Sequence, residues 1–413
     1  MTQESWVDRY TCLLPRISAH ARGTQLILCG LASCADAYLR LAEAEALFAA
    51  KPGTKPNALA QELIRRTERG SGGEFFLDWP DAETWIEKNL RIANWGLGGT
   101  GAQAAQTLAI LGARALISLE DRNERKLSVI HPDVLVADSS GVKRRGELSS
   151  QPGSEPVHYI FEVAASEQIG PVRASRSTRI IVRFAHHHLD RDPHFVRVSQ
   201  QNAGTAGAAV VCGFNELADE SLSEELEHAR KLLSGWRERG LAMIHLELGG
   251  YESIAARDQV LSMLGPVITS LGMSHTELRG FGKDDAVKQA SRFVTKFDLR
   301  RVCVHADQWA LTVTRDDAET ELESLLCGCL LSSCRAEFGA PCVPTRVPAG
   351  ARFSSPDWPL ISGSGNHLAV CCAAPYLERP MATIGLGDTF LAGTLLVLGQ
   401  SPGTHNFSSS TLH

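Results

Sequence analysis

Short apolar runs alternate along this chain with longer stretches in which the apolar residues repeat at helical spacing. The apolar runs predict buried strands at residues 25–31, 115–119, 208–212, 242–248 and 301–305. The helical spacing and composition predict helices at residues 37–50, 57–68, 81–88, 101–111, 222–235 and 257–271. Strands that alternate with helices are typical of a parallel sheet, so the pattern predicts an α/β fold.

Residues 120–171 break this alternation, because their apolar runs are shorter and more strand-like. The runs at 129–130, 134–136 and 159–161 predict short strands without a long helix between them. We therefore expect this segment to form a β-rich lid that is inserted into the main fold.

The composition is that of an ordinary globular protein. Of the 413 residues, 44% are hydrophobic, and the net charge is −6. A negatively charged chain has no general attraction for nucleic acid or anionic membranes, so neither is expected as a partner. A bilayer-spanning helix needs about 20 consecutive apolar residues, and no apolar run in this chain approaches that length.

The cysteines and the beginning of the chain bear on its location. The first residues lack the cationic and apolar regions of a secretory leader, and several of the eleven cysteines lie in apolar runs. We therefore expect a cytoplasmic protein with reduced, buried thiols. Cys327, Cys329, Cys334 and Cys342 lack the paired spacing of a zinc site, and the adjacent histidines 186–188 are expected in a connector between lid and main fold.

The glycine-rich run at residues 383–390, TIGLGDTF, is the most informative segment. It predicts a turn that opens a helix, whose first amides would face an anion. Gly385 and Gly387 allow a close approach of the backbone, and Asp388 lies where the helix begins. A carboxylate that faces an anion-binding turn suits phosphoryl transfer to a hydroxyl, with Asp388 as the base. The alternative is that Asp388 only stabilises the helix dipole, and this run alone leaves both interpretations open.

A second glycine-rich loop, GLGGTG at residues 96–101, also precedes a predicted helix. It fits the dinucleotide fingerprint, with Glu120 and Asp121 at the end of the next strand. An NAD-linked oxidoreductase is therefore one hypothesis, although no second element supports hydride transfer. The same residues, Gly98 and Gly99 followed by small residues, also resemble the N-terminal signature of the ribokinase superfamily, in which paired glycines approach a sugar.

The order of the two glycine motifs favours the ribokinase superfamily over the dinucleotide fold. Asp36 follows the first predicted strand, where that superfamily places an acid that binds substrate hydroxyls. A helix N-cap is the alternative for Asp36. Within the superfamily, residues 26–396 resemble the ADP-dependent sugar kinases, the glucokinases and phosphofructokinases. The segments that carry this resemblance occur in the shared order at residues 158–162, 176–180, 244–248 and 271–278.

The resemblance implies a three-layer α/β/α core of the ribokinase type and a smaller β-containing lid, with the sugar between them. The expected core comprises residues 1–36, 95–115 and 186–413, and the expected lid comprises residues 37–94 and 116–185. The implied donor is ADP, which yields AMP, and the implied cofactor is Mg²⁺. We expect a monomer or a small homo-oligomer, and the sequence does not identify the sugar.

The resemblance also implies roles for individual residues. The nucleotide would lie near Thr383, Gly385 and Leu386, and the metal near Glu247 and Glu277. The sugar would lie near Asp36, Gly98 and Gly99. Further substrate contacts would come from Arg176 and Arg179, which can pair with phosphate, and from Glu74, which matches a sugar-binding acid of the glucokinase branch. For Glu247, Glu277 and Glu74, the alternative is an exposed surface position. For the two arginines, the alternative is a solvated face of the lid.

Several positions depart from the pattern of this family, which often has asparagine there. These positions are Ala32, Cys34, Thr100, Thr178 and Ser274. Alanine and cysteine cannot replace both the donor and the acceptor of an amide, so sugar recognition is expected to differ. The intact Asp388 and its glycines favour an active catalyst. A non-catalytic sugar or nucleotide sensor on the same fold is the other hypothesis.

Overall fold

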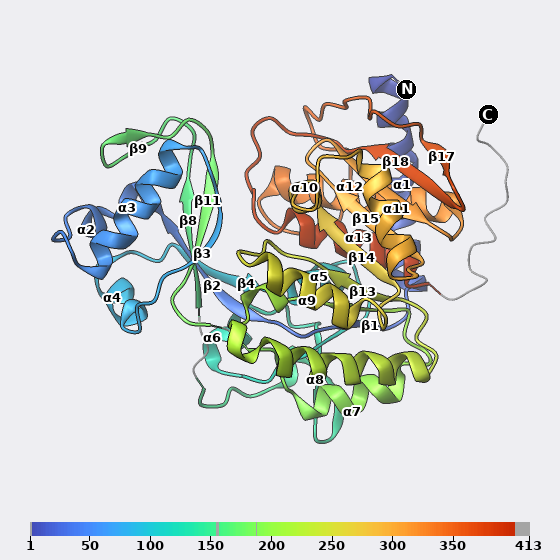
Figure 1. Cartoon of the computed structure of the whole chain (residues 1–413), viewed down its shortest axis with the longest axis horizontal. Helices are drawn as coiled ribbons and strands as arrows, with labels where there is room; N and C mark the ends of the chain where they lie inside the picture. Colours follow the sequence, from blue (N-terminus) through green and yellow to red (C-terminus); the bar gives the residue numbers. More distant parts are fainter. Residues whose placement is uncertain (1, 154–156, 187, 401–413) are drawn as a thin grey trace.

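The computed structural model describes residues 2–153, 157–186 and 188–400. These residues form a large sheet with a hydrophobic core on each face, a smaller sheet with a core of its own, and a separate two-stranded hairpin. In Figure 1 the small sheet and its helices lie at the left, and the large sheet with its helices lies at the right and below. No helix among the described residues is long and apolar enough to cross a membrane.

The large sheet has eleven strands within the described residues. Their order is β17 (Ile361–Ser364), β18 (His367–Ala373), β16 (Trp309–Thr314), β15 (Arg301–His305), β14 (Ser270–Ser274), β13 (Ile244–Glu247), β12 (Ala208–Val211), β1 (Ile27–Cys29), β5 (Ala115–Ile117), β6 (Leu135–Asp138) and β7 (Gly141–Arg144). The strands from β15 to β6 run parallel, and antiparallel strands close both edges. The ends of the parallel strands therefore meet at one edge of the sheet.

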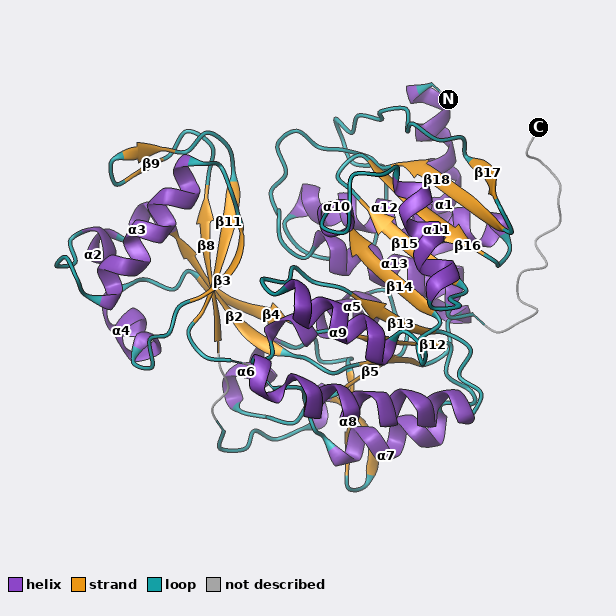
Figure 2. Ribbon diagram, in the orientation of Figure 1, coloured by secondary structure: helices purple, strands orange, loops and turns teal. Residues whose placement is uncertain are grey.

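Helices cover both faces of this sheet, as Figure 2 shows. One face carries α1 (Gln3–Gly23), α5 (Thr100–Ile110), α12 (Ala318–Phe338) and α13 (Leu386–Leu398). The other face carries α7 (Pro193–Asn202), α8 (Asp219–Glu238), α9 (Ile254–Leu264) and α11 (Ala286–Lys296). Successive strand residues such as Ala209 and Val210 belong to opposite cores, because side chains alternate across a strand. The expected three-layer α/β/α architecture is confirmed.

The small sheet has the order β3 (Gly73–Phe76), β11 (Thr178–Arg183), β8 (Val157–Val163), β2 (Cys34–Arg40) and β4 (Asn94–Gly98). Its core includes residues of α2 (Glu45–Phe48), α3 (Lys55–Glu68) and α4 (Ala82–Asn89). The remaining elements are the hairpin of β9 (Gln168–Ile169) and β10 (Val172–Arg173), the helices α6 (Glu124–Val129) and α10 (His275–Arg279), and three 3₁₀ turns at Leu41–Glu43, Arg145–Glu147 and Phe214–Glu216.

The predicted helix at residues 37–50 is wrong over most of its length. The first part of this segment is β2, which is followed by a 3₁₀ turn and the short helix α2. Strand β2 pairs with β4 on one edge and with β8 on the other, and nearly all of its residues are buried. Pairing on both edges outweighs the helix-favouring composition. Two further predictions are corrected. The helix predicted at residues 257–271 ends at Leu264, and the short strand predicted at residues 129–130 is instead the end of helix α6.

The predicted lid boundaries also differ from the membership of the two sheets. Strands β6 and β7, expected in the lid, pair at the edge of the large sheet, whereas Asp36 and β4, expected in the core, lie in the small sheet. Because β4 and β5 lie in different sheets, they do not form the βαβ unit that the loop at 96–101 predicted. The dinucleotide-binding hypothesis loses its structural basis here.

Within the described residues, the thiols are largely buried and the histidine segment lies in a connector, as the sequence predicts. Cys327 and Cys329 are buried in α12, and Cys371 and Cys372 lie in β18. His186 follows β11 in the connecting segment and stacks on Phe76, with ring centroids 4.1 Å apart. His187 lies outside the described residues.

Candidate active site

The glycine-rich run at 383–390 forms the beginning of α13, as predicted. Gly385 is the N-cap, and its φ of 68° is a left-handed conformation that favours glycine. The helix then starts with a hydrogen bond of 3.0 Å from the Thr389 amide to the Gly385 carbonyl. The first amides of a helix have no acceptor within it, so they present partial positive charge at this end. Asp388 lies in this first turn and is half-buried.

Charged and polar groups from three other elements surround Asp388. Burial raises the pKa of its carboxyl, whereas Arg335, a hydrogen bond with Thr100 and Arg179 work against the rise. Thr100 is the first residue of α5. The contact between Thr100 and Asp388 therefore brings together the two glycine motifs, which are nearly three hundred residues apart in the sequence.

Arg335 lies in α12, under the beginning of α13. Its guanidinium is buried, and Nη1 donates a hydrogen bond of 3.0 Å to the Thr389 hydroxyl. It lies so close to Gly385 that a side chain at that position would overlap it. A fixed cation therefore lies beside the amides at the start of α13, where an anion is expected to bind.

Residues of the small sheet reach the same place. Arg179 in β11 donates a hydrogen bond to the carbonyl oxygen of Thr383, just before α13. Burial lowers the pKa of Arg179, and the nearby Asp388 and Tyr38 oppose that shift. The interaction between Arg179 and Thr383 therefore connects the predicted lid to the predicted catalytic turn.

The second predicted acid cluster lies at the ends of the parallel strands. Glu247 ends β13 and lies 2.7 Å from Nε2 of His245 and 3.4 Å from Nε2 of His305. Burial would raise the pKa of Glu247, but these two imidazoles lower it to about 2. Glu247 is therefore ionised and its orientation is fixed by two neighbours.

Glu277 lies near Glu247, in the first turn of α10, which directly follows the next strand, β14. It forms a capping box with Ser274: the Ser274 amide donates to Glu277 at 2.7 Å, and the Glu277 amide donates to the Ser274 hydroxyl at 3.2 Å. Burial and the charge of Glu247 raise the pKa of Glu277 to about 7. Two carboxylates that repel one another here would both be stabilised by a divalent cation.

The paired glycines lie against Asp36. Strands β2 and β4 are antiparallel, with Cys34 opposite Gly98, and a side chain at Gly98 would overlap both Asp36 and Cys34. Gly99 has a φ of 87°, and a side chain at this position would overlap the Ala32 carbonyl. Asp36 itself is 3% exposed and lies within β2, so it is neither a helix N-cap nor at the end of the first strand.

Asp36 belongs to a polar cluster in the small sheet. His158 in β8 lies directly opposite it, with Nδ1 3.5 Å from the Asp36 carboxylate. The other ring nitrogen of His158 lies 3.5 Å from Glu216. Glu74, whose predicted alternative was an exposed surface acid, is instead half-buried and ion-paired with Arg183.

Most of the predicted site residues lie in two groups, one around Asp388 and one around Asp36, and Arg176 is the exception. Arg176 is exposed and donates a hydrogen bond of 2.6 Å to the Gly70 carbonyl, away from α13. The residues that the sequence did not indicate are His305, Tyr38 and Arg335. Arg335 has the clearest signal in retrospect, because it is a lone cation in an otherwise apolar part of α12.

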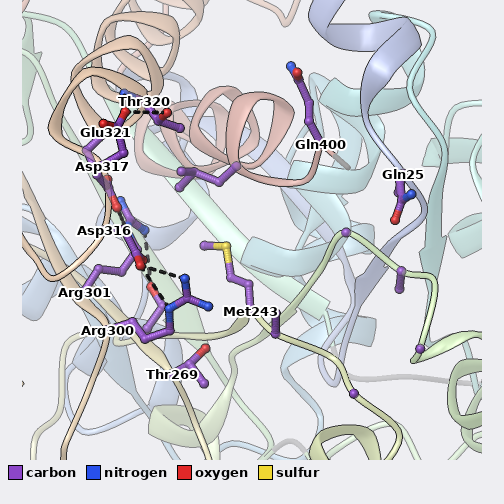
Figure 3. Close-up of a pocket in the computed structure, with 17 residues that line it drawn as sticks. Gln25, Met243, Thr269, Arg300, Arg301, Asp316, Asp317, Thr320, Glu321 and Gln400 are labelled. Atoms are coloured by element: carbon purple, nitrogen blue, oxygen red, sulfur yellow. Dashed lines mark hydrogen bonds and ion pairs between the residues drawn. The ribbon is translucent and has the colours of Figure 1, made fainter. Parts of the chain in front are cut away.

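A separate cavity of about 420 Å³ lies at the opposite ends of the same strands (Figure 3). It is lined by residues that begin or precede strands, including Met243, Thr269 and Arg301. In Figure 3 the pair of Arg300 with Asp316 lies on one side of this cavity, and Gln25 and Gln400 lie on the other. It contains none of the predicted site residues.

Comparisons with known proteins agree with this arrangement. A model of the ADP-specific phosphofructokinase/glucokinase conserved region matches residues 26–325. The ADP-specific phosphofructokinase of Thermococcus litoralis is 21% identical over 392 residues, which cover 82% of this chain and 85% of that protein.

Solved structures share the fold over nearly the whole chain. An ADP-dependent kinase in complex with fructose 6-phosphate and ADPβS has a TM-score of 0.80 at 17% identity, with 97% of this chain and 99% of that chain covered. A phosphofructokinase from Pyrococcus horikoshii OT3 with AMP has a TM-score of 0.71 at 16% identity, with coverage of 91% and 98%.

Proposed function

The chain belongs to the ADP-specific phosphofructokinase/glucokinase family, and on that premise we propose how this ADP-dependent sugar kinase performs its reaction. The β-phosphoryl group of ADP moves to a hydroxyl of a sugar phosphate, and AMP is the second product. The observation that carries the proposal is the position of Asp388 in the first turn of α13, where the charge of the buried Arg335 acts on its carboxyl.

Asp388 acts as the general base. It takes the proton of the acceptor hydroxyl while the new O–P bond forms and the bond from phosphorus to the AMP oxygen breaks. Burial raises the pKa of Asp388, which makes it a stronger base than an exposed aspartate. Arg335 and the hydrogen bond from Thr100 favour the ionised carboxylate and limit this rise.

Arg335 and the first amides of α13 stabilise the transferring group. Charge spreads over the oxygens of the phosphoryl group in the transition state, and fixed donors stabilise it there. Arg179 adds a second cation from the small sheet and is held by the Thr383 carbonyl. An incoming nucleotide phosphate would therefore contact residues of both sheets, which supports a closed site that excludes water.

Glu247 and Glu277 fit a Mg²⁺ site near the phosphates. Both offer carboxylate oxygens, the ligands this ion prefers, and their mutual repulsion would be relieved by it. His245 and His305 orient Glu247, as outer-shell partners do. When bound, the ion would neutralise part of the charge of the donor phosphates.

The acceptor lies against Asp36 and the paired glycines Gly98 and Gly99. Asp36 would accept hydrogen bonds from sugar hydroxyls, and Gly98, which has no side chain, leaves room for the Asp36 and Cys34 side chains beside it. Fructose 6-phosphate is the first acceptor to test, because two of the relatives named above are phosphofructokinases and the third was solved with fructose 6-phosphate. Glucose is the second, because Glu74 resembles the sugar-binding acid of the glucokinase branch and its charge is balanced by Arg183.

We also infer a cytoplasmic location. All eleven cysteines are free, and nine of them are buried, which suits a reducing compartment. The expectation of a monomer or small homo-oligomer stays a prediction.

The experiment is a panel of donors and acceptors, with AMP and phosphorylated sugar measured by chromatography. ADP with fructose 6-phosphate should give equal amounts of AMP and the bisphosphate, and ATP should be a poor donor. The isosteric variant Asp388→Asn should form almost no product while it still binds ADP. Product formation by that variant at a normal rate would reject Asp388 as the base. A purified protein that forms no AMP with any sugar would favour the non-catalytic alternative.

A further inference from the structure

A second cluster of metal-ligating side chains lies in the small sheet, apart from Glu247 and Glu277. It consists of Cys34, Asp36 and His158, all of which are buried. We propose that Cys34 Sγ, the Asp36 carboxylate and His158 Nδ1 form a binding site for a zinc-like divalent metal, and that the metal competes with the sugar for Asp36. The second half of this proposal rests on the proposed position of the acceptor.

The strand pairing sets the three ligands side by side. Cys34 and Asp36 are two residues apart in β2, so both side chains project from the same face of the sheet. His158 in β8 is the residue directly opposite Asp36. Neighbouring strands keep such residues close, so the cluster is held by the backbone of the small sheet.

The distances between the ligand atoms already match a tetrahedral ion. Sγ of Cys34 lies 3.3 Å from Nδ1 of His158 and 3.6 Å from Oδ1 of Asp36, and the third side of the triangle measures 3.5 Å. Zinc binds sulfur at about 2.3 Å and nitrogen or oxygen at about 2.0–2.2 Å. Tetrahedral angles at those bond lengths separate the ligand atoms by about 3.3–3.6 Å. The ion would therefore fit with little movement of the protein.

The second ring nitrogen of His158, Nε2, has the kind of carboxylate partner that is common behind metal-bound histidines. Nε2 of His158 faces Glu216 at 3.5 Å, which places a carboxylate behind the proposed ligand. Such a partner fixes the orientation of a metal-bound histidine and raises its basicity. Glu74 lies on this same side, but it is ion-paired with Arg183. We therefore assign the ion to the Nδ1 side, and Glu216 to the outer shell.

The chemistry of the three donors selects the metal. A thiolate and an imidazole favour zinc-like ions and disfavour Mg²⁺, which prefers oxygen ligands. Burial raises the pKa of the Cys34 thiol to about 12. Metal binding therefore releases to solvent the thiol proton of Cys34 and any proton on Nδ1 of His158, and new S–metal and N–metal bonds replace the S–H and N–H bonds.

Three protein ligands leave one tetrahedral position open. Structural zinc sites fill all four positions with protein, whereas an open position binds water or another small molecule. The backbone of Gly98 lies against Cys34 and Asp36, on the side where the sugar is expected. A bound ion would take the Asp36 carboxylate away from the sugar hydroxyls, so metal and acceptor cannot both use it.

The test is a cobalt titration of the full-length protein under anaerobic conditions, without nucleotide. Co²⁺ that is bound by a thiolate in a tetrahedral site gives sulfur-to-metal charge-transfer absorption and intense visible bands. We expect one equivalent to bind with this spectrum, and Zn²⁺ to displace it. Cys34→Ser should lose the charge-transfer band, and His158→Gln should bind at least about 10–100-fold more weakly. Cys12→Ser, which alters an exposed thiol, should behave like the wild type.

Each outcome decides one part of the proposal. Absence of the charge-transfer band in the wild type, or its persistence in a folded Cys34→Ser variant, would overturn the metal site; circular dichroism checks folding. Fructose 6-phosphate, added without ADP, should bleach the cobalt spectrum, and a spectrum that is unchanged at saturating sugar would overturn the competition. Because cobalt binding needs no turnover, a protein that binds no cobalt would overturn the metal site and leave the kinase assignment intact. A protein that binds cobalt but has no kinase activity would support the metal site and count against the proposed function.

Discussion

Two clusters in this molecule join a carboxylate to an imidazole, and they differ in what surrounds the pair. At the end of the large sheet, Glu247 lies between two histidines and its pKa falls to about 2. In the small sheet, Asp36 faces one histidine and a thiol, and it is His158 whose pKa is changed: burial would lower it, but Cys34, Glu216 and Asp36 raise it well above the usual value. At the large sheet the ionised carboxylate of Glu247 is favoured, and Glu247 raises the pKa of His305; in the small sheet the protonated form of His158 is favoured.

The difference follows from the neighbouring groups. The large-sheet cluster adds a second acid, Glu277, and lies near the positive end of α13, so it suits phosphates and a hard divalent ion. The small-sheet cluster adds Cys34 and lies against the paired glycines, so it suits a sugar or a softer metal. Two similar pairs of a carboxylate and an imidazole therefore acquire different chemistry from the third group beside them.

The largest expected effect separates the two regions by kinetics. Asp388→Asn should lower kcat by about 10²–10⁴-fold, because a general base is lost. Asp36→Asn should instead raise KM for the acceptor by about 10–150-fold, as expected for one hydrogen bond to a charged group, with a smaller change in kcat. Steady-state kinetics with fructose 6-phosphate measures both. The opposite split, with kcat lost in Asp36→Asn, would exchange their roles.

The next effect concerns the metal requirement at the large sheet. Glu277→Gln should raise the Mg²⁺ concentration for half-maximal activity by about 10–100-fold, because one carboxylate no longer attracts the ion. Glu252→Gln changes an exposed acid after β13 and serves as the matched control. A Mg²⁺ titration at saturating ADP measures the change. If the curves of both variants equal that of the wild type, Glu277 does not belong to the site.

A third prediction tests how firmly the catalytic turn is supported. Gly393 in α13 packs against Gly328 in α12, and a methyl group at Gly393 would lie 2.6 Å from the Gly328 Cα. Gly393→Ala should therefore lower the free energy of unfolding by about 1–3 kcal/mol, as overpacking does. Gly363→Ala, at an exposed glycine with open space around it, is the control. Urea unfolding measures both, and equal stabilities would show that the two helices can separate without cost.

The smallest effect is a shift in pH dependence. Asp388 must be ionised to act as a base, so kcat/KM should fall as the pH drops through its pKa, which lies above the usual range of aspartate. Arg335 favours the ionised form, so Arg335→Gln should raise that pKa and move the acid limb by about one pH unit to higher pH. The exposed Arg346→Gln is the control. A limb that moves to lower pH, or stays in place, would contradict the role of Arg335.

The catalytic turn was the most predictable part of the site. Residues 383–390 contain the glycines, the acid and the start of the helix within one segment, so local chemistry alone specifies their arrangement. The pair of Glu247 and Glu277 was also accessible, because both follow apolar runs that form neighbouring parallel strands. The resemblance to a known family supplied the donor and the metal, which spacing could not supply.

The small sheet was the least predictable part. Strand β2 has the composition of a helix, and it becomes a strand because β4 and β8 pair with its two edges. Cys34 and His158 are 124 residues apart, and their contact exists only in that pairing. Neither segment has a local sequence feature that indicates the other as its pairing partner. Arg335 is similar, since nothing in α12 indicates that its guanidinium lies under a helix that begins fifty residues later.

The sequence by itself determined the alternation of strands and helices, the turn at Gly385 and the family, because each depends on residues that are neighbours in the chain or recur in a fixed order. The tertiary structure alone decided which sheet received β2, β4, β6 and β7, and which side chains meet at Asp36 and Asp388. The physical reason is that backbone hydrogen bonds and burial join distant segments, and their partners are set by the whole fold rather than by local propensity.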